Sequence, residues 1–187
     1  MFARTERLLL RPAWAEDADA LFHTIGDERI VRNLATAPWP YLPEHAETWA
    51  SACRPADRPA ALIFLRVGGA PELVGGIGIH DRPDGAVELG YWIARRHWGR
   101  GYATEAGMAM VAFARDALRL PGLVAGHFLD NPASGSVLRK LDFAPTGRIG
   151  MRHSLARGEE APVAEFVLQL NRIAAEEIGH SAHPLAA

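Results

Sequence analysis

The sequence predicts a single mixed α/β (α+β) domain, built on a central sheet of about seven mostly antiparallel strands with helices on both faces. Three observations lead to this prediction. The chain has 187 residues, a length that fits one domain. Hydrophobic residues make up 49% of the chain and charged residues 22%, which is typical of a globular protein with a sizeable core. Segments with strand and helix periodicity follow one another along the chain, which favours helices packed on a sheet.

The first part of the chain predicts one strand, then helices, then a run of antiparallel strands. Pro12 ends the opening strand, because proline cannot donate to a sheet ladder. Apolar residues on one stripe and acidic residues in the first turn favour the helices. Turn signals such as the segment 82–85 (RPDG) favour consecutive hairpins. Helices are expected over residues 15–26, 28–34 and 43–53. Strands are expected over residues 7–12, 60–67, 72–80 and 86–94.

The second part of the chain predicts a long helix followed by alternating elements. Residues 104–118 are apolar nearly all round, so this helix should be buried against the sheet, and Thr104 is its expected N-cap. A strand over 123–129 and a helix over 134–141 come next, and strands over 148–155 and 163–170 complete the sheet. We therefore expect residues 1–172 to form the domain and residues 173–187 to form a flexible C-terminal tail.

Composition excludes several classes of protein. Every run of twelve residues contains a charged residue, so no transmembrane helix is predicted. The first eleven residues contain charges and no apolar core, so no secretory signal is expected. The single cysteine, Cys53, excludes an internal disulfide and a multi-cysteine metal site. A net charge of -2 argues against a nucleic-acid scaffold. These observations predict a cytoplasmic protein.

The segment ELGYWIARRHWGRGYATEA, at residues 88–106, has the clearest chemical signal. At its centre, Arg96-His97-Trp98-Gly99-Arg100-Gly101 directly precedes a predicted helix. Glycines let the backbone turn tightly and approach a ligand, and N–H groups at a helix N-terminus attract a phosphate. One Gly-x-Gly pattern is weak evidence among 18 glycines, and we interpret Gly76-Ile77-Gly78 as strand packing. The strand, the helix and the neighbouring arginines together predict an anion-binding loop.

Two familiar nucleotide-binding loops do not fit this segment. The sequence contains no Gly-x-x-x-x-Gly-Lys-Ser/Thr run, which a P-loop requires. A third glycine is missing where a dinucleotide-binding fingerprint needs it, and the preceding strand belongs to an antiparallel run. The predicted loop therefore binds an anion in some other way.

The pattern Arg/Gln-x-x-Gly-x-Gly/Ala between a strand and a helix resembles the acyl-CoA pyrophosphate loop of the GNAT superfamily of N-acetyltransferases. The longer segment 88–106 is similar to the RimJ/RimL branch, which includes ribosomal-protein N-terminal acetyltransferases. The opening TERLLLRP (5–12) and the pattern of Asn131, Ser134 and Phe143 also resemble that branch. The resemblance covers about residues 5–170. It implies a GNAT-like fold and an acetyl-CoA-dependent acyltransferase that acetylates a primary amine, either a protein or peptide N-terminus or a small amine.

The resemblance also implies which residues bind the cofactor. The backbone of residues 92–94 would pair with the pantetheine arm like an added strand. Backbone N–H groups of Arg96 and of residues 99–103 would hold the pyrophosphate, while Asn131 and Phe143 would contact the pantetheine arm. No metal is implied. The full set of implied cofactor-binding residues is Trp92, Ile93, Ala94, Arg96, Gly99, Arg100, Gly101, Tyr102, Ala103, Thr104, Asn131 and Phe143.

One position departs from the family pattern. The family usually has glycine directly before the phenylalanine that corresponds to Phe143, and this chain has Asp142. Aspartate tolerates a left-handed backbone better than most residues, so we expect the turn to survive.

The implied reaction is direct attack of an amine on an acetyl thioester, and the amine must first lose a proton. Glu88 is our first choice of base, because its strand would flank the thioester and strand alternation places Glu88, Gly90 and Trp92 on one face. His80, at the end of the preceding strand, Asp130 and a water molecule are the alternatives.

Two further roles follow from the resemblance. A backbone N–H at Ile93 or Ala94 would stabilise the oxyanion. Many family members have a tyrosine acid where this chain has Leu138, and Ser134 corresponds to the substitute proposed in the RimJ/RimL branch. Our expected catalytic residues are therefore Glu88 and Ser134.

Alternative functions and partners stay open at this point. A non-catalytic acyl-CoA sensor with the same fold is the main alternative, and a nucleotide-binding regulator is a third. The expected partners are acetyl-CoA and an amine acceptor, with no nucleic acid and no membrane, and both a monomer and a homodimer are compatible with the sequence. Glu44, Glu47 and Asp57 lie near the expected acceptor loop, where an acidic pocket would favour polycationic amines.

Overall fold

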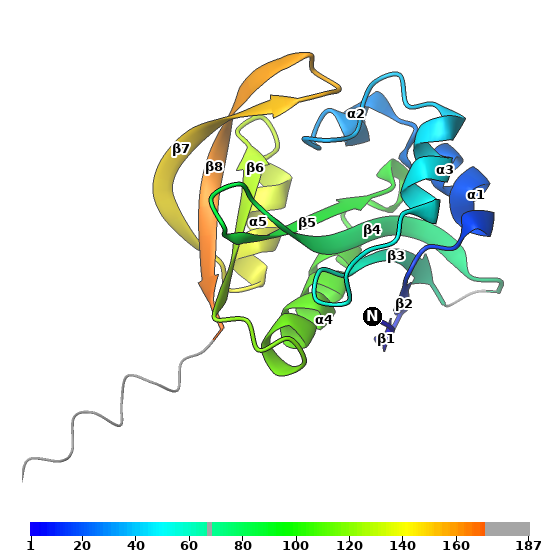
Figure 1. The fold of residues 1–187 in the computed structure, drawn as a ribbon, viewed down its shortest axis with the longest axis horizontal. Helices are drawn as coiled ribbons and strands as arrows, with labels where there is room; N and C mark the ends of the chain where they lie inside the picture. The colour runs from blue at the N-terminus through cyan, green and yellow to red at the C-terminus, as the bar shows by residue number, and fades with distance from the viewer. Residues whose placement is uncertain (67–68, 171–187) are drawn as a thin grey trace, which may run out of the picture.

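The computed structural model describes residues 1–66 and 69–170, which form one sheet in the order β1-β2-β3-β4-β5-β6-β8-β7 (Figure 1). Every neighbouring pair is antiparallel except β5 and β6. The strands are β1 (Ala3–Arg4), β2 (Leu8–Arg11), β3 (Ala60–Leu65), β4 (Glu72–Asp81), β5 (Val87–Ile93), β6 (Gly122–Phe128), β7 (Ala144–Ser154) and β8 (Glu159–Gln169). The helices are η1 (Ala15–Asp17), α1 (Ala18–Ile25), α2 (Glu28–Val31), α3 (Pro43–Ser51), η2 (Arg95–His97), α4 (Tyr102–Asp116) and α5 (Pro132–Lys140).

These elements confirm the predicted mixed α/β class and its mostly antiparallel sheet. The described part of the chain has eight strands, where the sequence predicted about seven. The additional strand is β1, whose Ala3 pairs with Leu10 of β2. Two residues are too short to show alternation, so the sequence carried no signal for β1. The predicted tail, residues 173–187, and the end of the predicted strand 60–67 lie outside the described residues.

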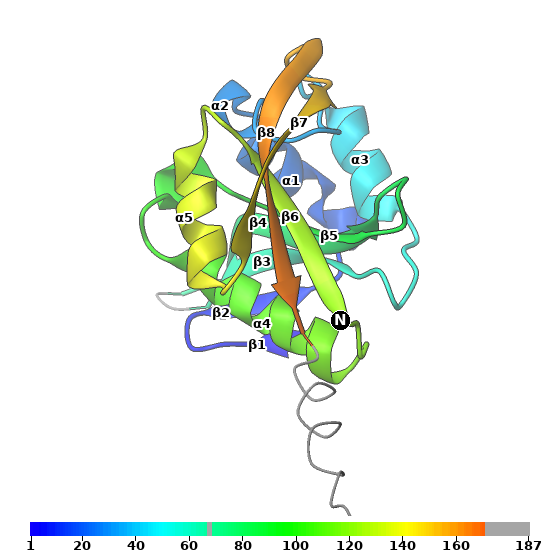
Figure 2. The same cartoon turned by 90° about the vertical axis from the view of Figure 1, so that its left-hand side faces the viewer.

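The helices cover both faces of the sheet, as predicted (Figures 1 and 2). On one face, α4 and α5 pack with Leu10, Ile63 and Leu89 into the larger core, to which α4 contributes the fully buried Met110. On the other face, α1, α2 and α3 pack against β3 and β4 around Leu62. Apolar residues on alternate faces of the same strands therefore build two cores, one on each side of the sheet.

The parallel pair β5–β6 is the weak point of the sheet. Its register contains one residue pair, Glu88↔Val124, and beyond that pair the two strands diverge (Figure 1). The helix α4 connects them, as a parallel pair requires a crossover. After Glu88 the strand β5 therefore has no ladder partner on the side of β6, and we call the gap between the two strands the β5–β6 split.

Several boundaries differ from the predicted ones. Helix α4 begins at Tyr102, so Thr104 lies inside the first turn and the N-cap position belongs to Gly101. Helix α5 begins at Pro132, at the first helical position, where the missing N–H of proline has no cost. Helix α2 ends at Val31, three residues before the predicted end at Leu34. None of the helices within 1–66 and 69–170 has the length and apolarity that crossing a lipid bilayer would require.

Candidate active site

The predicted anion-binding loop connects β5 to α4. The turn η2 is followed by Gly99 at φ 75° and Gly101 at φ 80°, a left-handed backbone that suits glycine. A Cβ built on Gly99 would meet no atom within 4 Å, so the space beside the turn is open. Helix α4 starts at Tyr102 with no side-chain cap. Its first N–H groups therefore lack side-chain partners there and, with the helix dipole, favour an anion.

The N-terminal segment holds this loop in place through Glu105. Oε1 of Glu105 accepts hydrogen bonds from Thr5 Oγ1 at 2.5 Å and from the Arg7 N–H at 2.8 Å. Arg7 also binds Oε2 at 2.7 Å, and its Nη1 donates to the Arg100 carbonyl at 3.0 Å. Burial raises the pKa of Glu105, but the contacts from Thr5 and Arg7 outweigh it and lower the pKa. The positive charge of Arg7 therefore balances the negative charge of Glu105 in the first turn of α4.

The side chains of Arg96 and His97 are engaged by a carboxylate at the start of β4. Both bind Oε1 of Glu72, Arg96 at 3.0 Å and His97 Nε2 at 3.1 Å. Arg96 can therefore serve an anion through its backbone N–H, the role that the resemblance implied, while its guanidinium is already paired. His97 is buried and packs against Tyr102, with ring centroids 5.9 Å apart.

The backbone of β5 determines which peptide groups face the split. The Ala94 N–H donates to the Val74 carbonyl at 2.8 Å, and the Ala94 carbonyl accepts from the His97 N–H at 2.8 Å. In an antiparallel ladder the backbone N–H and C=O groups of alternate residues point toward the partner strand. The backbone groups of Trp92, like those of Ala94, therefore point toward β4. Among residues 92–94, which the resemblance implied as partners of the pantetheine arm, Ile93 is the one whose backbone N–H and C=O groups point toward the split. The Ala94 N–H, one of the two expected oxyanion donors, is thus already used inside the sheet.

The carbonyl of Ile93 has a local partner at the edge of the split. Trp98 Nε1 donates to it at 2.7 Å, although the Trp98 side chain is otherwise exposed. A ligand that paired with Ile93 as an added strand would have to replace this bond.

Glu88 lies at the narrow end of the split, with both oxygens near a basic side chain. Its carboxylate is 5% exposed, Oε1 accepts a hydrogen bond of 2.6 Å from Arg152 Nη1, and Oε2 lies 3.6 Å from His80 Nε2. Burial raises the pKa of Glu88, but His80 and Arg152 together outweigh burial and hold it below its usual value. His80 pairs directly opposite Glu88 on β4 and is 60% exposed. The site therefore holds a charged carboxylate, a guanidinium and an accessible imidazole.

Ser134 lies in the first turn of α5, next to Tyr91 of β5. The Tyr91 hydroxyl is 2.8 Å from Ser134 Oγ and 3.1 Å from the Ser134 carbonyl oxygen. Burial raises the pKa of Tyr91 to about 12, so this hydroxyl stays protonated and can donate. Tyr91 comes from the face of β5 that packs on α4 and α5, while Glu88 and Trp92 face the other side, which agrees with the predicted alternation.

The remaining predicted residues surround α5. Asn131 occupies the N-cap position of this helix, and Phe143 and Leu138 are buried in the larger core. Asp142 has φ 64°, so aspartate does adopt the left-handed turn where the family has glycine.

Asp130 is fully engaged by arginines. Both of its oxygens bind Arg157, at 2.8 and 3.0 Å, and Oδ2 also accepts a bond of 3.1 Å from Arg32. These contacts, chiefly the hydrogen bonds from Arg157, lower the pKa of Asp130. Together with the bond of 2.9 Å from Ser154 Oγ to the Leu34 carbonyl, they join the β7–β8 hairpin to the chain after α2 (Figure 1). Both oxygens of Asp130 are thus paired with arginines where the hairpin meets the chain after α2.

A cavity of about 510 Å³ lies between the α1–α2 turn and η2. It is lined by His23, Thr24, Gly26, Asp27, Ile30, Arg95 and Arg96. Arg95 and Asp27 approach each other to 3.9 Å across it. Two of the loop's arginines thus border open space on the side of the sheet that α1 and α2 cover.

Three interactions at this site were not predicted from the sequence. Arg152, Tyr91 and Arg7 contact Glu88, Ser134 and Glu105 across 64, 43 and 98 residues of chain. Alternation along 148–155 does place Arg152 on one face of its strand, but no periodic signal pairs it with β5.

Comparison with known proteins shows the family to which the chain belongs. The model of the acetyltransferase (GNAT) domain matches residues 7–144. The Bacillus subtilis (strain 168) protein called "Uncharacterized N-acetyltransferase YoaA" is 31% identical over 153 residues, which cover 76% of this chain and 82% of that protein.

Solved structures show the same fold. An acetyltransferase of the GNAT family from Bacillus anthracis has a TM-score of 0.76 and 21% identity, covering 90% of this chain and 98% of the other. RimL, the ribosomal L7/L12 alpha-N-protein acetyltransferase solved with coenzyme A, has a TM-score of 0.73 and 18% identity, covering 91% and 98%. The chain is an acetyltransferase that belongs to the GNAT family and has a RimJ/RimL-like fold.

Proposed function

We propose that this acetyltransferase moves the acetyl group of acetyl-CoA directly to a primary amine. The observation that carries the proposal is the placement of the glycine loop. The left-handed turn at Gly99 and Gly101 presents the N-terminus of the fifteen-residue helix α4. Strand β5, which leads into this loop, borders the split and carries Glu88. An anion site, an extended backbone and a proton acceptor thus follow one another within a single segment.

Coenzyme A fits this arrangement part by part. N–H groups of Arg96 and of residues 99–104 would bind the pyrophosphate, and the open space beside Gly99 leaves room for it. Ile93 would pair with the pantetheine arm in place of Trp98. Asn131, at the N-cap of α5, and Phe143, three residues after the end of that helix, complete the set proposed for the arm.

His80 and Glu88 would share the work of removing the amine proton. A carboxylate whose pKa is lowered is a weaker base, so Glu88 alone is poorly suited to this task. His80 is accessible and lies 3.6 Å from Glu88, and histidine is the side chain that most often acts as a general base. We infer that His80 takes the proton and that Glu88 orients the ring and stabilises its positive charge.

The other groups act on the acetyl carbon and the sulfur. The amine nitrogen bonds to the acetyl carbon, and the N–H of Ile93 donates to the oxygen on which negative charge develops. As the carbon–sulfur bond breaks, Ser134 donates a proton to the departing sulfur. Tyr91, with its hydroxyl 2.8 Å from Ser134 Oγ, supplies a proton in turn or holds the serine in position. The amide and free coenzyme A are the products.

The experiment combines binding with turnover. Titration calorimetry with coenzyme A should show saturable binding, and acetyl-CoA with a panel of peptides and small amines should release free thiol. Mass spectrometry should find one added acetyl group on the accepted amine. Binding without thiol release for any amine would support the sensor alternative, and absence of both would overturn the cofactor assignment.

A further inference from the structure

An arginine beside Glu88 has most of its hydrogen-bonding capacity unused. A guanidinium carries five N–H donors. Arg152 donates one of them to Glu88. Within residues 1–66 and 69–170, its Nε and Nη2 have no hydrogen-bond partner. The Arg152 side chain is 27% exposed, so it is partly accessible from solvent. This arginine can bind a second anion without giving up the first.

Neighbouring arginines each approach carboxylates of their own. Arg82 lies between two carboxylates, 3.2 Å from Asp84 and 3.6 Å from Glu165. Arg157 forms a two-pronged pair with Asp130. In contrast, the one carboxylate of Arg152, Glu88, also approaches His80.

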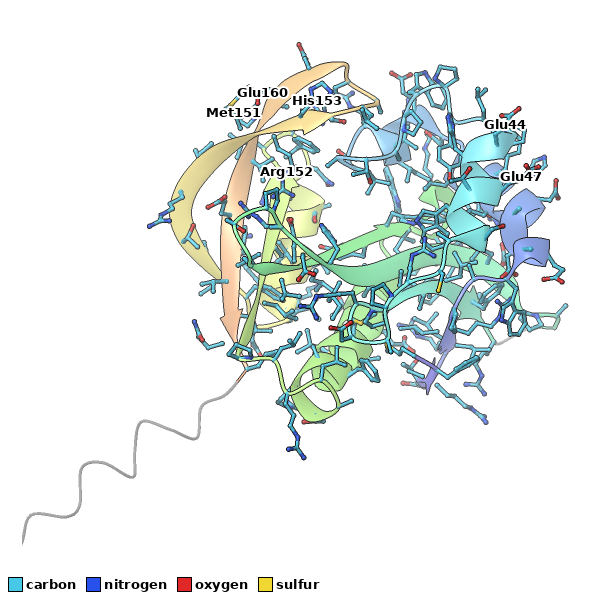
Figure 3. The ribbon with its side chains drawn as sticks, viewed as in Figure 1. Glu44, Glu47, Met151, Arg152, His153 and Glu160 are labelled. Carbon is cyan, nitrogen blue, oxygen red and sulfur yellow. The ribbon has the colours of Figure 1, made fainter. Side chains whose placement is uncertain are left out.

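The unused donors lie close to the reacting groups. Arg152 stands on the side of β7 that faces the middle of the sheet, opposite Met151 and His153 (Figure 3). Its Nη2 is 3.9 Å from the point where a Cβ on Gly126 of β6 would be. Its Nη1 is 2.6 Å from Oε1 of Glu88, which lies at the narrow end of the split. Arg152 and His80 approach the two oxygens of the same carboxylate, so a group bound by Nε and Nη2 would lie near an amine at His80.

The charges at this place favour an acceptor that carries both signs. Arg152 balances Glu88, and His80 is the third titratable group of the cluster. Arg82 balances the partly buried Glu165, and the second carboxylate beside Arg82, that of Asp84, is 56% exposed and therefore largely solvated. A simple ammonium ion would add an unbalanced positive charge, whereas a zwitterion would add none, and partly buried charges need partners. A guanidinium fork also matches the two oxygens of a carboxylate.

We propose that the acceptor carries a carboxylate next to its amine, as a free α-amino acid does, and that Arg152 binds this carboxylate through Nε and Nη2. The proposal rests on the acetyltransferase function proposed above and narrows its acceptor. A protein N-terminus carries a neutral amide where an amino acid carries the carboxylate, so it would leave the two donors without their anion. Arg152 thereby determines specificity while it also holds Glu88.

The test compares acceptors that differ in the carboxylate. Thiol release from acetyl-CoA is measured with a panel of amino acids, with the amide of each, and with the amine that lacks the carboxyl group, such as leucine, leucinamide and isopentylamine. For the best side chain, the amino acid should exceed both analogues in kcat/KM by about tenfold or more, because charge-assisted hydrogen bonds are lost in the analogues. A short peptide with the same first residue serves as the model of a protein N-terminus.

Two variants assign the effect to Arg152. Arg152→Lys keeps a positive charge beside Glu88 but loses the fork, so the preference for the amino acid over its amide should fall about fivefold or more while the KM for acetyl-CoA stays nearly constant. Arg82→Lys is the matched control, since Arg82 lies on the same face, and it should keep the preference. Calorimetry on the enzyme with coenzyme A bound should detect the amino acid and not its amide.

The outcomes separate the two proposals. Amides, peptides or simple amines that react as well as the amino acid would overturn the carboxylate anchor and leave the acetyltransferase function standing. A preference that survives Arg152→Lys would overturn the role of Arg152. Coenzyme A binding without thiol release from any amine would overturn the proposed function and the anchor together.

Discussion

Nη1 of Arg152 on β7 donates a hydrogen bond of 2.6 Å to Oε1 of Glu88 on β5, and this contact joins the two parts of the sheet that separate at the β5–β6 split. Beside it, β5 and β6 share one residue pair. The ion pair therefore has a structural role, as a tie across the split, and a chemical role, because it sets the charge next to the candidate base.

Breaking this pair from one side should destabilise the fold. Arg152→Ala leaves the Glu88 carboxylate, 5% exposed, without its main partner, and removal of one member of such a pair costs about 3 kcal/mol. The double variant Arg152→Ala/Glu88→Gln should recover part of the loss, because no buried charge remains. Urea unfolding of the four proteins measures the coupling. If the losses of stability in the two single variants simply add in the double variant, Arg152 and Glu88 are not coupled, and their ion pair does not hold the two parts of the sheet together.

Acid should weaken the protein partly through Glu88. Its pKa in the folded state lies below the ordinary value of 4.5, so between the two values the unfolded chain binds more protons. The stabilisation from Glu88 is therefore complete above about pH 4.5 and disappears as pH falls through the lowered pKa.

Glu88→Gln should make the melting temperature depend less on pH over about pH 3 to 5, measured by circular dichroism. Asp116→Asn is the control. Asp116 is paired with Arg115 on the exposed surface, where ion pairs contribute little, so its removal should leave the curve unchanged. Equal flattening in both variants would refute the special role of Glu88.

Gly101→Ala should weaken coenzyme A binding by about tenfold or more, since φ 80° is strained for alanine and relaxation would move the N–H groups of the loop. Gly147, at φ 77° in the irregular part of β7, is a matched control. Gly147→Ala should introduce similar strain, of about 1 kcal/mol or more, without changing the affinity for coenzyme A in calorimetry. A loss of affinity in both variants would indicate a general stability effect.

Ser134→Ala should lower kcat by about tenfold or more with little change in the KM for acetyl-CoA, because a proton donor acts in the transition state. Tyr91→Phe should reproduce part of this loss. Ser136 lies on the same helix and donates only to the Pro132 carbonyl, at 3.2 Å, so Ser136→Ala should keep normal rates. Steady-state kinetics distinguish these cases, and a normal kcat in Ser134→Ala would remove Ser134 from the mechanism.

Coenzyme A should change the environment of Trp98, because pairing with Ile93 replaces the indole hydrogen bond of 2.7 Å. Tryptophan fluorescence should therefore shift on titration with coenzyme A, and Trp98→Phe should lose most of that shift. Trp14, which is similarly exposed and stacks with Arg11 at 3.9 Å, is the control for substitution. An unchanged signal in Trp98→Phe would show that the cofactor leaves Ile93 alone.

Local pattern in the sequence was sufficient for most of the elements and for the glycine loop. Proline positions, apolar stripes and turn residues act over a few neighbours, so the strands from β2 to β8 and all the longer helices could be predicted. Errors occurred at element ends, where one glycine or proline decides: Gly101 and Tyr102 begin α4 two residues before the predicted Thr104. The alternation that puts Glu88 and Trp92 on one face of β5 was also readable, because the period of a strand is two.

By itself, then, the sequence determined the α/β class, the position of the glycine loop before a helix, and the family resemblance. Only the tertiary structure decided what each polar group does. In the folded chain the Ala94 N–H is hydrogen-bonded inside the sheet, and Asp130 is paired with two arginines. Arg152 contacts Glu88 across 64 residues of chain. The physical reason is that ionisation and hydrogen bonding depend on burial and on contacts between distant segments, and neither leaves a periodic trace in the chain.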